Sequence, residues 1–530
     1  MRLASSREMK ELDRIAIEER KIPSIDLMER AADHIVNAVR TRMRGEKSAA
    51  AALFCGTGNN GGDGLAAARK LYDAGILARA FLVGDPQKLT KDAREECRRL
   101  EAAGFSLEYY DESSEEQRQW TMDCEVIVDA LFGVGLSRDI EEGSIYASAV
   151  RLMNESPAQV VAADIASGLA ADSGRVLGCA VRAEETVTFS LPKIGQFLGE
   201  GPAYSGKVRV QDIGLPRDLI EGGLPSRLFM VDEKAAAPLL PERKPDGHKG
   251  NFGKVLVVGG SVGYTGAPYL CASAAVHGGC GLVYLGVPRS IWAVEAGKCV
   301  SSMPFPLEDA DGKLSERALP KILERLESCD VLALGPGLGR SEGVTKLVTA
   351  LLLQTEKPVV LDADGINALE GHIDSLDGRR DRVTILTPHE GEFARVGGDL
   401  TSGDRLLAAR TFAKAHGCTL VLKGHRTITV SPEGEAFLNT TGSSGLAKGG
   451  SGDVLTGLIA SLLAQGLSAE AASALGVWLH GRAGDEAEEL FTPYAVTPEK
   501  VISALPRSFS ALMRRKKKEE ALCAKFFAYQ

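Results

Sequence analysis

The chain has 530 residues, with 62 Lys and Arg against 71 Asp and Glu, which gives a formal net charge of −9. At about 150 residues per domain, this length predicts two to four domains whose core needs no disulfide or metal for stability. The acidic balance offers no general attraction for nucleic acid or an anionic membrane, so we expect neither as a partner.

Cysteine spacing and hydropathy indicate the compartment. The ten cysteines are scattered, and Cys271 and Cys280 are too far apart for a CxxC redox or zinc motif. The N-terminal residues 1–20 are charged and helical in pattern, and no run reaches the ~18 apolar residues of a membrane span. We therefore expect reduced thiols and a cytoplasmic protein.

The first half alternates apolar runs with helical stretches, which predicts a parallel sheet with helices on both faces. Ligands of such a sheet bind beyond the carboxyl ends of its strands. The expected strands are 49–56, 76–84, 125–131 and 158–165, and the expected helices are 65–75 and 89–104.

The second half contains another α/β series. Its expected strands are 254–260, 281–287, 330–339, 357–365, 382–393 and 418–424, followed by an antiparallel hairpin of 427–430 and 435–438. Between the two series, residues 216–248 are rich in Pro, Gly and charge, and we place the boundary near Gly222. The predicted domains are 1–222 and 223–513, and a basic C-terminal tail, 514–530, reads as a solvated helix end rather than a nucleic-acid arm.

Three polar segments follow strands of the first half. The segment Asn59–Gly64, NNGGDG, opens the helix expected from Leu65, where glycines allow close approach of a ligand and free N–H groups favour an anion. A plain glycine-rich turn is the alternative for this segment. Asp129 and Asp164 end two further strands, where they suit acid–base chemistry, cation coordination or helix capping.

Five motifs of the first half resemble those of the NAD(P)H-hydrate epimerase domain. In chain order they are NNGGDGL, DALFGVGL, DIASGL, TVTF with Lys193 shortly after, and DIGLP. The resemblance implies a Rossmann-like α/β/α sandwich in which Asn60, Asp129 and Ser167 hold a potassium ion. Asp164 ends its strand three residues before Ser167, which places it either to move protons near the nicotinamide as a catalytic residue or only to position the ribose or the ring. The substrate contacts that the resemblance implies are Asn59, Asn60, Gly61, Gly62, Asp63, Gly133, Val134, Gly135, Leu136, Ser137, Arg138, Asp139 and Asp164. Val134 stands where Thr is common in that family, and Ala166 where Pro is common.

A glycine- and serine-rich segment, Thr441–Asp453, precedes an apolar helical stretch in the second half. Its backbone N–H groups can surround phosphate oxygens at a helix N-terminus, although Asp453 alone would read as a carboxylate stabilised by the helix dipole. The Gly-x-Gly-Asp pattern resembles that of ribokinase-like small-molecule kinases. That resemblance implies that Asp453 takes a proton from a substrate hydroxyl.

The remaining motifs resemble the ADP-dependent NAD(P)H-hydrate dehydratase branch of those kinases. They are HKGNFG from His248, YTGAP from Tyr264, GPGLG from Gly335, DADG from Asp362, TPH with GEF from Thr387, and KG at Lys423. The resemblance implies substrate contacts from Ala267, Gly337, His389 and Asp453, and nucleotide contacts from Lys423, Gly424, His425, Arg426, Thr427 and Gly452. Ser443-Ser444 replace the usual Asn-Pro, and Glu390 replaces the usual Pro.

Together the two resemblances imply repair of NADHX and NADPHX, nicotinamide cofactors hydrated at C6 of the ring. The first half would interconvert the R and S hydrates, and the second would dehydrate the S form at the expense of ADP, with potassium and magnesium as ions. We also expect a homo-oligomer with small-molecule partners. The alternative is a ribokinase-like vitamin-precursor kinase fused to a noncatalytic binding module, for which a persistent phosphorylated product would be evidence.

Overall fold

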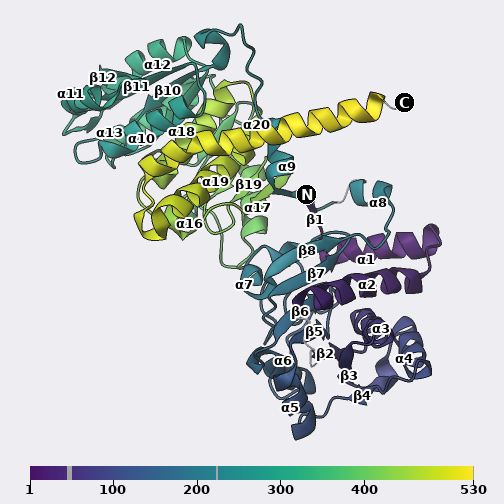
Figure 1. Ribbon diagram of the computed structural model, residues 1–530. Helices are drawn as coiled ribbons and strands as arrows, with labels where there is room; N and C mark the ends of the chain where they lie inside the picture. The colour runs from purple at the N-terminus through teal and green to yellow at the C-terminus, as the bar shows by residue number, and fades with distance from the viewer. Residues whose placement is uncertain (44–49, 223–224, 529–530) are drawn as a thin grey trace. The chain divides into compact units, whose positions relative to one another are not determined.

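The computed structural model describes residues 1–43, 50–222 and 225–528, without the side chains of 519–528 (Figure 1). It divides into two compact units, Arg2–Arg227 and, together with Met1, Leu228–Gln530. This division lies close to the predicted boundary between residues 222 and 223, the second of which is outside the described residues. Both units are α/β folds, which confirms the predicted class.

The first unit is built on a parallel sheet of seven strands in the order β4-β3-β2-β5-β6-β7-β8. Its central strands are buried on both faces, because alternate residues enter two different cores: Leu53 of β2 packs with one and Phe54 with the other. The strands are β2 (Ala50–Cys55), β3 (Leu77–Leu82), β4 (Glu108–Tyr109), β5 (Val126–Ala130), β6 (Gln159–Ala163), β7 (Glu185–Phe189) and β8 (Lys207–Gln211), besides the short β1 (Arg2–Leu3).

Helices cover both faces of this sheet, as the alternation predicted (Figure 1). Apolar residues of α1 to α4 fill the core on one face, and those of α6 fill the core on the other, which α5 also covers. These helices are α1 (Ser6–Arg14), α2 (Ser24–Arg42), α3 (Asn59–Asp73), α4 (Lys91–Ala102), α5 (Glu115–Asp123) and α6 (Ile145–Glu155). A π-helical segment, η1 (Ile15–Glu19), continues α1, and the short α7 (Gly201–Ser205) and α8 (Arg217–Glu221) flank β8.

The larger sheet of the second unit runs in the order β9-β20-β19-β18-β17-β16-β15-β10-β11-β12. Its pairs are parallel except for β18–β19 and β19–β20, which confirms the predicted antiparallel hairpin. The strands are β9 (Leu228–Val231), β10 (Lys254–Val258), β11 (Leu282–Pro288), β12 (Met303–Leu307), β15 (Val331–Leu334), β16 (Val359–Leu361), β17 (Thr384–Leu386), β18 (Thr419–Leu422), β19 (Ile428–Val430) and β20 (Ala436–Asn439); β13 (Asp309–Ala310) and β14 (Lys313–Leu314) form a separate hairpin.

Most of the helical residues that share one apolar core with this sheet come from α10 (Gly266–His277), α18 (Ser451–Ala464), α19 (Ala469–Ala495) and α20 (Pro498–Ala528). The predicted basic tail continues α20 as far as Ala528, and Lys516 Nζ donates to the Leu240 carbonyl at 3.0 Å. The other helices are α9 (Glu233–Ala236), α11 (Arg289–Lys298), α12 (Leu319–Glu327), α13 (Glu342–Gln354), α14 (Asp364–Asn367), α15 (Asp374–Asp377), α16 (Glu390–Arg395) and α17 (Arg405–His416).

The cysteines and the helix hydropathy bear on the expectations of reduced thiols and of no membrane span. Every cysteine whose side chain is described is a free thiol. Within the same part of the chain, no helix has the length and apolarity that crossing a membrane requires.

Candidate functional site

The NNGGDG segment forms the start of helix α3, which begins at Asn59 rather than at Leu65 as predicted. Glycine is required inside this first turn because a Cβ on Gly61 would stand 1.8 Å from the carbonyl oxygen of Gly56. The glycines therefore bring helical backbone against the end of β2, and they do not form a loop. The first N–H groups of a helix lack acceptors within it, so the start of α3 keeps the anion-binding character that the sequence predicted.

Two of the three predicted potassium ligands lie together. Asp129 on β5 is buried and accepts hydrogen bonds from the backbone N and the hydroxyl of Ser167 at 2.7 and 2.6 Å. Burial nevertheless raises the pKa of Asp129 to about 6. Asn60 is also buried, and neither polar atom of its amide has a hydrogen-bond partner among the described residues. An unsatisfied buried amide is costly, and amide, carboxylate and hydroxyl oxygens suit a hard cation, so this donor set fits potassium.

Asp164 is held in place from several sides. It follows β6 with a φ of 65°, in the left-handed region that Asp adopts more readily than most residues. The buried Lys193 forms an ion pair with its carboxylate and donates to Thr188 Oγ1 at 2.8 Å, while Gln196 Nε2 donates to the Asp164 carbonyl at 2.8 Å. Left-handed backbone at a non-glycine residue that is fixed in this way is typical of functional sites.

A cavity of about 860 Å³ lies beyond the carboxyl ends of β2, β5 and β6. Most of the predicted substrate residues line it, namely Asn59, Asn60, Asp63, all residues from Gly133 to Asp139, and Asp164. Gly61 and Gly62 instead pack against neighbouring backbone and side chains, and Asp129 and Ser167 are not part of the lining. The cavity has the size and the concave, partly apolar character of a ligand site.

The cavity also has lining residues that sequence reasoning missed. Lys10 and Asp13 come from α1, Thr57 precedes α3, and Tyr146 comes from α6. No motif marks these residues. In α1, a polar residue stands at every third position of an amphipathic helix. This pattern could have pointed to a ligand site, but it is equally typical of a helix face exposed to solvent.

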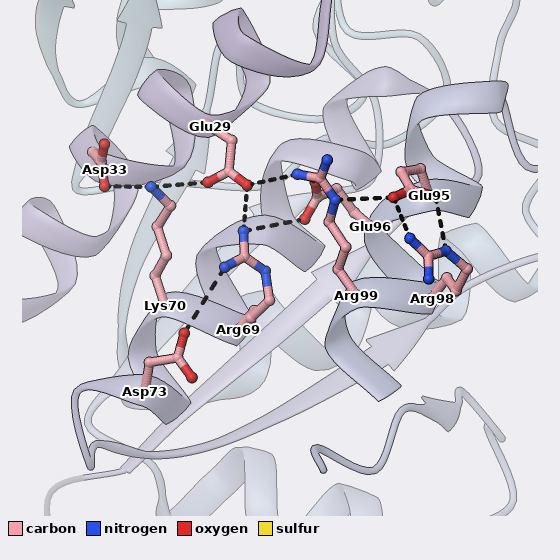
Figure 2. Close-up of polar contacts among 9 residues, drawn as sticks. All are labelled: Glu29, Asp33, Arg69, Lys70, Asp73, Glu95, Glu96, Arg98 and Arg99. Carbon is pink, nitrogen blue, oxygen red and sulfur yellow. Dashed lines mark hydrogen bonds and ion pairs between the residues drawn. The ribbon is translucent and has the colours of Figure 1, made fainter. Parts of the chain in front are cut away.

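A network of ion pairs holds α3 to its neighbours α2 and α4 (Figure 2). Arg69 of α3 contacts Glu29 of α2 and lies 3.4 Å from Glu96 of α4, while Arg99 lies 3.0 Å from Glu29 and 3.1 Å from Glu96. Lys70 adds a contact with Glu29 at 3.0 Å. Glu96 is fully buried, so its carboxylate depends on these arginines for compensation. The network fixes the helix whose first turn lines the cavity.

In the second unit, Asp453 occupies the first turn of α18, as predicted, after Gly450 with a φ of 98°. Its carboxyl group has no hydrogen bond or ion pair with any described residue. Burial and then the nearby Asp362 raise the pKa of Asp453 to about 7, against the opposing effect of Lys423. A carboxyl group that titrates near neutral pH suits general acid–base work.

Asp362, by contrast, is buried and fully engaged. Lys423 Nζ lies 2.8 Å from its Oδ1, and the hydroxyls of Thr387 and Thr456 donate to the same carboxylate at 2.8 Å each. A Cβ on Gly452 would lie 3.1 Å from Lys423 Nζ, so the predicted nucleotide contacts Gly452 and Lys423 do meet. Thr456 was missed by sequence reasoning, and Asp362 and Thr387 were seen only as parts of motifs.

His389 caps the N-terminus of α16. Its Nδ1 accepts from the backbone N of Gly391 and Glu392 at 3.0 and 3.2 Å, which assigns the ring proton of a neutral imidazole to Nε2. Glu392 Oε2 accepts from the His389 backbone N at 2.9 Å and lies 3.8 Å from Lys423 Nζ. The cap therefore places His389 beside the Asp362–Lys423 pair.

The other predicted residues of this unit fall into two groups. Ala267, in the first turn of α10, would lie 3.0 Å from a Cβ on Gly337, so these two substrate contacts are neighbours. The segment that follows Lys423 is held by Arg405, whose Nη1 donates to the His425 carbonyl at 3.1 Å. Thr427 Oγ1 donates to the carbonyl of Gly424 at 3.1 Å, and Arg426 Nη1 to that of Thr440 at 2.8 Å.

Comparisons with known proteins agree with the family resemblances of both halves of the chain. The family described as "YjeF-related protein N-terminus" matches residues 24–195, and the NAD(P)H-hydrate dehydratase family matches residues 255–507. The bifunctional NAD(P)H-hydrate repair enzyme of Moorella thermoacetica is 41% identical over 494 residues, covering 92% of each chain. That of Thermofilum pendens is 39% identical over 517 residues, covering 97% of each chain.

A solved structure, the ADP/ATP-dependent NAD(P)H-hydrate dehydratase of Bacillus subtilis with ATP and Mg²⁺, is 28% identical with a TM-score of 0.44, covering 53% of this chain and 97% of its own. The full-length relatives do not favour a vitamin-precursor kinase fused to a noncatalytic module. The chain belongs to the bifunctional NAD(P)H-hydrate repair enzymes, with an N-terminal epimerase domain and a C-terminal dehydratase domain.

Proposed function

We propose that the chain repairs both hydrates of NADH and NADPH, with epimerisation in residues 1–222 and ADP-dependent dehydration of the S form in 223–513. The observation that carries the proposal is Asp453. It is a carboxyl group that has no partner in the part of the chain that the structure describes, with a pKa raised to about 7, at a glycine-rich helix start beside Lys423. We further propose that the enzyme works in the cytoplasm as a homo-oligomer.

In the dehydratase domain, Asp453 takes the proton from the C6 hydroxyl of the S hydrate as the hydroxyl oxygen attacks the terminal phosphoryl group of ADP. AMP leaves, and the backbone N–H groups at the start of α18 stabilise charge on the phosphoryl oxygens. Phosphate then departs from C6 with the electron pair of the C–O bond while the ring nitrogen forms a double bond to C6. A water molecule takes a proton from C5, the C5–C6 double bond forms as the electron pair returns to nitrogen, and the dihydropyridine ring of NADH is restored. Lys423 stays paired with Asp362 and supplies positive charge beside Gly452.

In the epimerase domain, Asp164 moves a proton at the C6 hydroxyl or at the water that replaces it. The ion pair with Lys193 orients its carboxylate, and the surrounding cavity accepts the dinucleotide. Purely positioning the ribose or the ring is the alternative role for Asp164.

Potassium, held by Asn60, Asp129 and Ser167, would supply positive charge near the nicotinamide. Crystals grown in potassium should show an ion among these side chains, with contacts longer than the 2.0–2.1 Å typical of magnesium. Water alone at saturating potassium would refute the site. We expect magnesium to enter with the nucleotide, bound mainly by phosphate oxygens, as is usual for this ion.

The deciding assay supplies purified chain with a mixture of R and S NADHX, with and without ADP, and follows NADH absorbance. We expect conversion of the whole mixture with ADP and no NADH formation without it. Accumulation of a stable phosphorylated hydrate in place of NADH would contradict the dehydratase proposal. Conversion of only the S half would contradict the epimerase proposal.

A further inference from the structure

Asp13 brings a carboxyl group from the N-terminal helix α1 into the epimerase cavity. It is the penultimate residue of α1 and lines the cavity together with Asp63 and Asp164. Its carboxyl group makes no hydrogen bond or ion pair with the part of the chain that the structure describes, and the same holds for Asp63. Of the three carboxyl groups, Asp164 alone has an ammonium partner, Lys193.

The backbone around Asp13 is also unusual. The next residues, Ile15–Glu19, form a π-helical segment, and Ile17 of this segment lines the same cavity. Segments of π-helix inside longer helices occur frequently at functional sites, because the wider turn redirects side chains. The local structure therefore turns this stretch of an N-terminal helix toward the ligand space.

The charge balance of the cavity leaves a proton near Asp164. Asp13, Asp63 and Asp164 share one buried ammonium group, that of Lys193, because the basic residues that line the cavity, Lys10, Lys88 and Arg138, are exposed to solvent. The three carboxyl groups cannot all ionise without strong repulsion. Burial, followed by the neighbouring Asp164, raises the pKa of Asp13 to about 6, and Lys193 opposes this. Burial also raises the pKa of Asp63, with further contributions from Asp164 and Asp13. A partly buried carboxyl group without a partner costs stability, which favours a functional role over a structural one.

We propose that Asp13 is the second proton-transfer group of the epimerase and works with Asp164. The inference rests on the proposed function of the first domain. The carboxylic acid of Asp13 gives its proton to the C6 hydroxyl, the C–O bond breaks, and water leaves while the ring nitrogen forms a double bond to C6. Asp164 then takes a proton from a second water molecule as its oxygen bonds to C6 on the other face, and the electron pair returns to nitrogen.

This sequence moves one proton from Asp13 to Asp164 and exchanges the C6 oxygen with solvent. In the reverse direction the two carboxyl groups exchange roles, so one pair serves both hydrates. Asp63, on α3, then remains available for binding the substrate, as predicted from the sequence.

The test compares Asp13→Asn with the full-length wild type and with Glu11→Gln, which removes a carboxylate from the exposed side of the same helix. The measurement is the rate of R-NADHX loss, with the two hydrates separated chromatographically and the spontaneous rate subtracted. We expect Asp13→Asn to lower kcat by ~10²-fold with little change in KM, as for a lost general acid, and Asp13→Glu to restore part of it. Glu11→Gln should match the wild type.

Two further readouts keep the interpretation clear. The thermal unfolding midpoint of Asp13→Asn should not fall, because the native carboxyl group has no partner to lose. In water labelled with heavy oxygen, wild-type turnover should place label at C6, and epimerisation without label would overturn the water-exchange step. If the wild type epimerises and Asp13→Asn has the same kcat, the role of Asp13 is overturned and the proposed function of the domain still stands. A wild type that does not epimerise would contradict the proposed function itself.

Discussion

In each domain a lysine binds one aspartate, while at least one further aspartate of the same site has no hydrogen-bond or ion-pair partner among the described residues. The epimerase domain pairs Lys193 with Asp164 and leaves Asp13 free. The dehydratase domain pairs Lys423 with Asp362 and leaves Asp453 free. Burial, followed by the neighbouring Asp164, raises the pKa of Asp13 to about 6, and burial, followed by Asp362, raises the pKa of Asp453 to about 7. In each site the lysine opposes the shift without cancelling it. Each domain thus holds a carboxyl group that titrates near neutral pH, as proton transfer by a side chain requires.

The two free carboxyl groups differ in their helical setting. Asp453 stands in the first turn of the 14-residue helix α18, where backbone N–H groups also favour a phosphoryl group. Asp13 stands near the end of the nine-residue helix α1, without such a set of donors. The difference matches the two proposed reactions, since only the proposed dehydration transfers a phosphoryl group, and the predictions below test how separate the two sites are.

The largest effect is expected for Asp164→Ala. This change removes the lysine-paired carboxylate, so conversion of R-NADHX should fall to the spontaneous rate, while ADP-dependent repair of S-NADHX stays at the wild-type rate. Both rates can be measured in one assay of the separated hydrates. Equal loss of both activities would refute independent active sites, and full retention of R conversion would remove Asp164 from the mechanism.

Asp453→Asn should produce the converse pattern. Dehydration should fall by ~10²-fold or more, the size expected for a lost general base, with epimerisation unchanged. Stability provides a control on folding. Because the pKa of Asp453 is raised from 3.8 to about 7, its contribution to stability is full below about pH 4 and is lost as the pH rises to about 7. In urea unfolding, the free energy of unfolding of Asp453→Asn should not show this fall between about pH 4 and pH 7. Near-normal turnover by the variant would refute the role of Asp453.

The pH dependence of dehydration separates the free aspartate from its lysine-paired neighbour. A base with a pKa of about 7 must lose its proton before it can act, so kcat/KM for S-NADHX should fall about tenfold per pH unit below about pH 7. A base paired like Asp362 would instead give a flat profile down to about pH 5. A flat profile measured with saturating ADP would therefore contradict the raised pKa of Asp453.

The sequence predicted one free aspartate and not the other, for a physical reason. Asp453 follows a run of glycines at the start of an apolar helix, a local pattern that is visible without the fold. Asp13 reaches its site only because the fold brings α1 to the cavity that Asp164 also lines, and nothing within its own helix indicates that placement. The central strands were predictable because burial on both faces makes them continuous apolar runs.

The start of α3 shows a second limit of local reasoning. Gly61 reads as a loop residue because glycine disfavours helix interiors by about 1 kcal/mol relative to alanine. In the fold it is required at that place, because the Gly56 carbonyl leaves no room for a Cβ. Tertiary packing thus overrides propensity, and the same helix depends on its ion pairs with α2 and α4.

The smallest effect on activity is expected when that network is weakened by Arg69→Met. The change removes the contacts with Glu29 and with the buried Glu96, which keeps Arg99 at 3.1 Å, so unfolding of the epimerase domain should become easier by about 1–3 kcal/mol. Arg98→Met is the matched control, because Arg98 is 70% exposed and pairs with Glu95 on the surface, where such pairs contribute about 0–1 kcal/mol. The measurement is the urea concentration at which R-NADHX conversion is lost at equilibrium. Without urea, R-NADHX conversion should stay close to the wild-type rate in both variants, since α3 remains folded. The urea concentration at which dehydration of S-NADHX is lost should be the same as in the wild type. Equal urea midpoints for the two variants would show that the network around Arg69 does not hold α3 in place, and the first turn of α3 would then owe its position to the close packing of Gly61 alone.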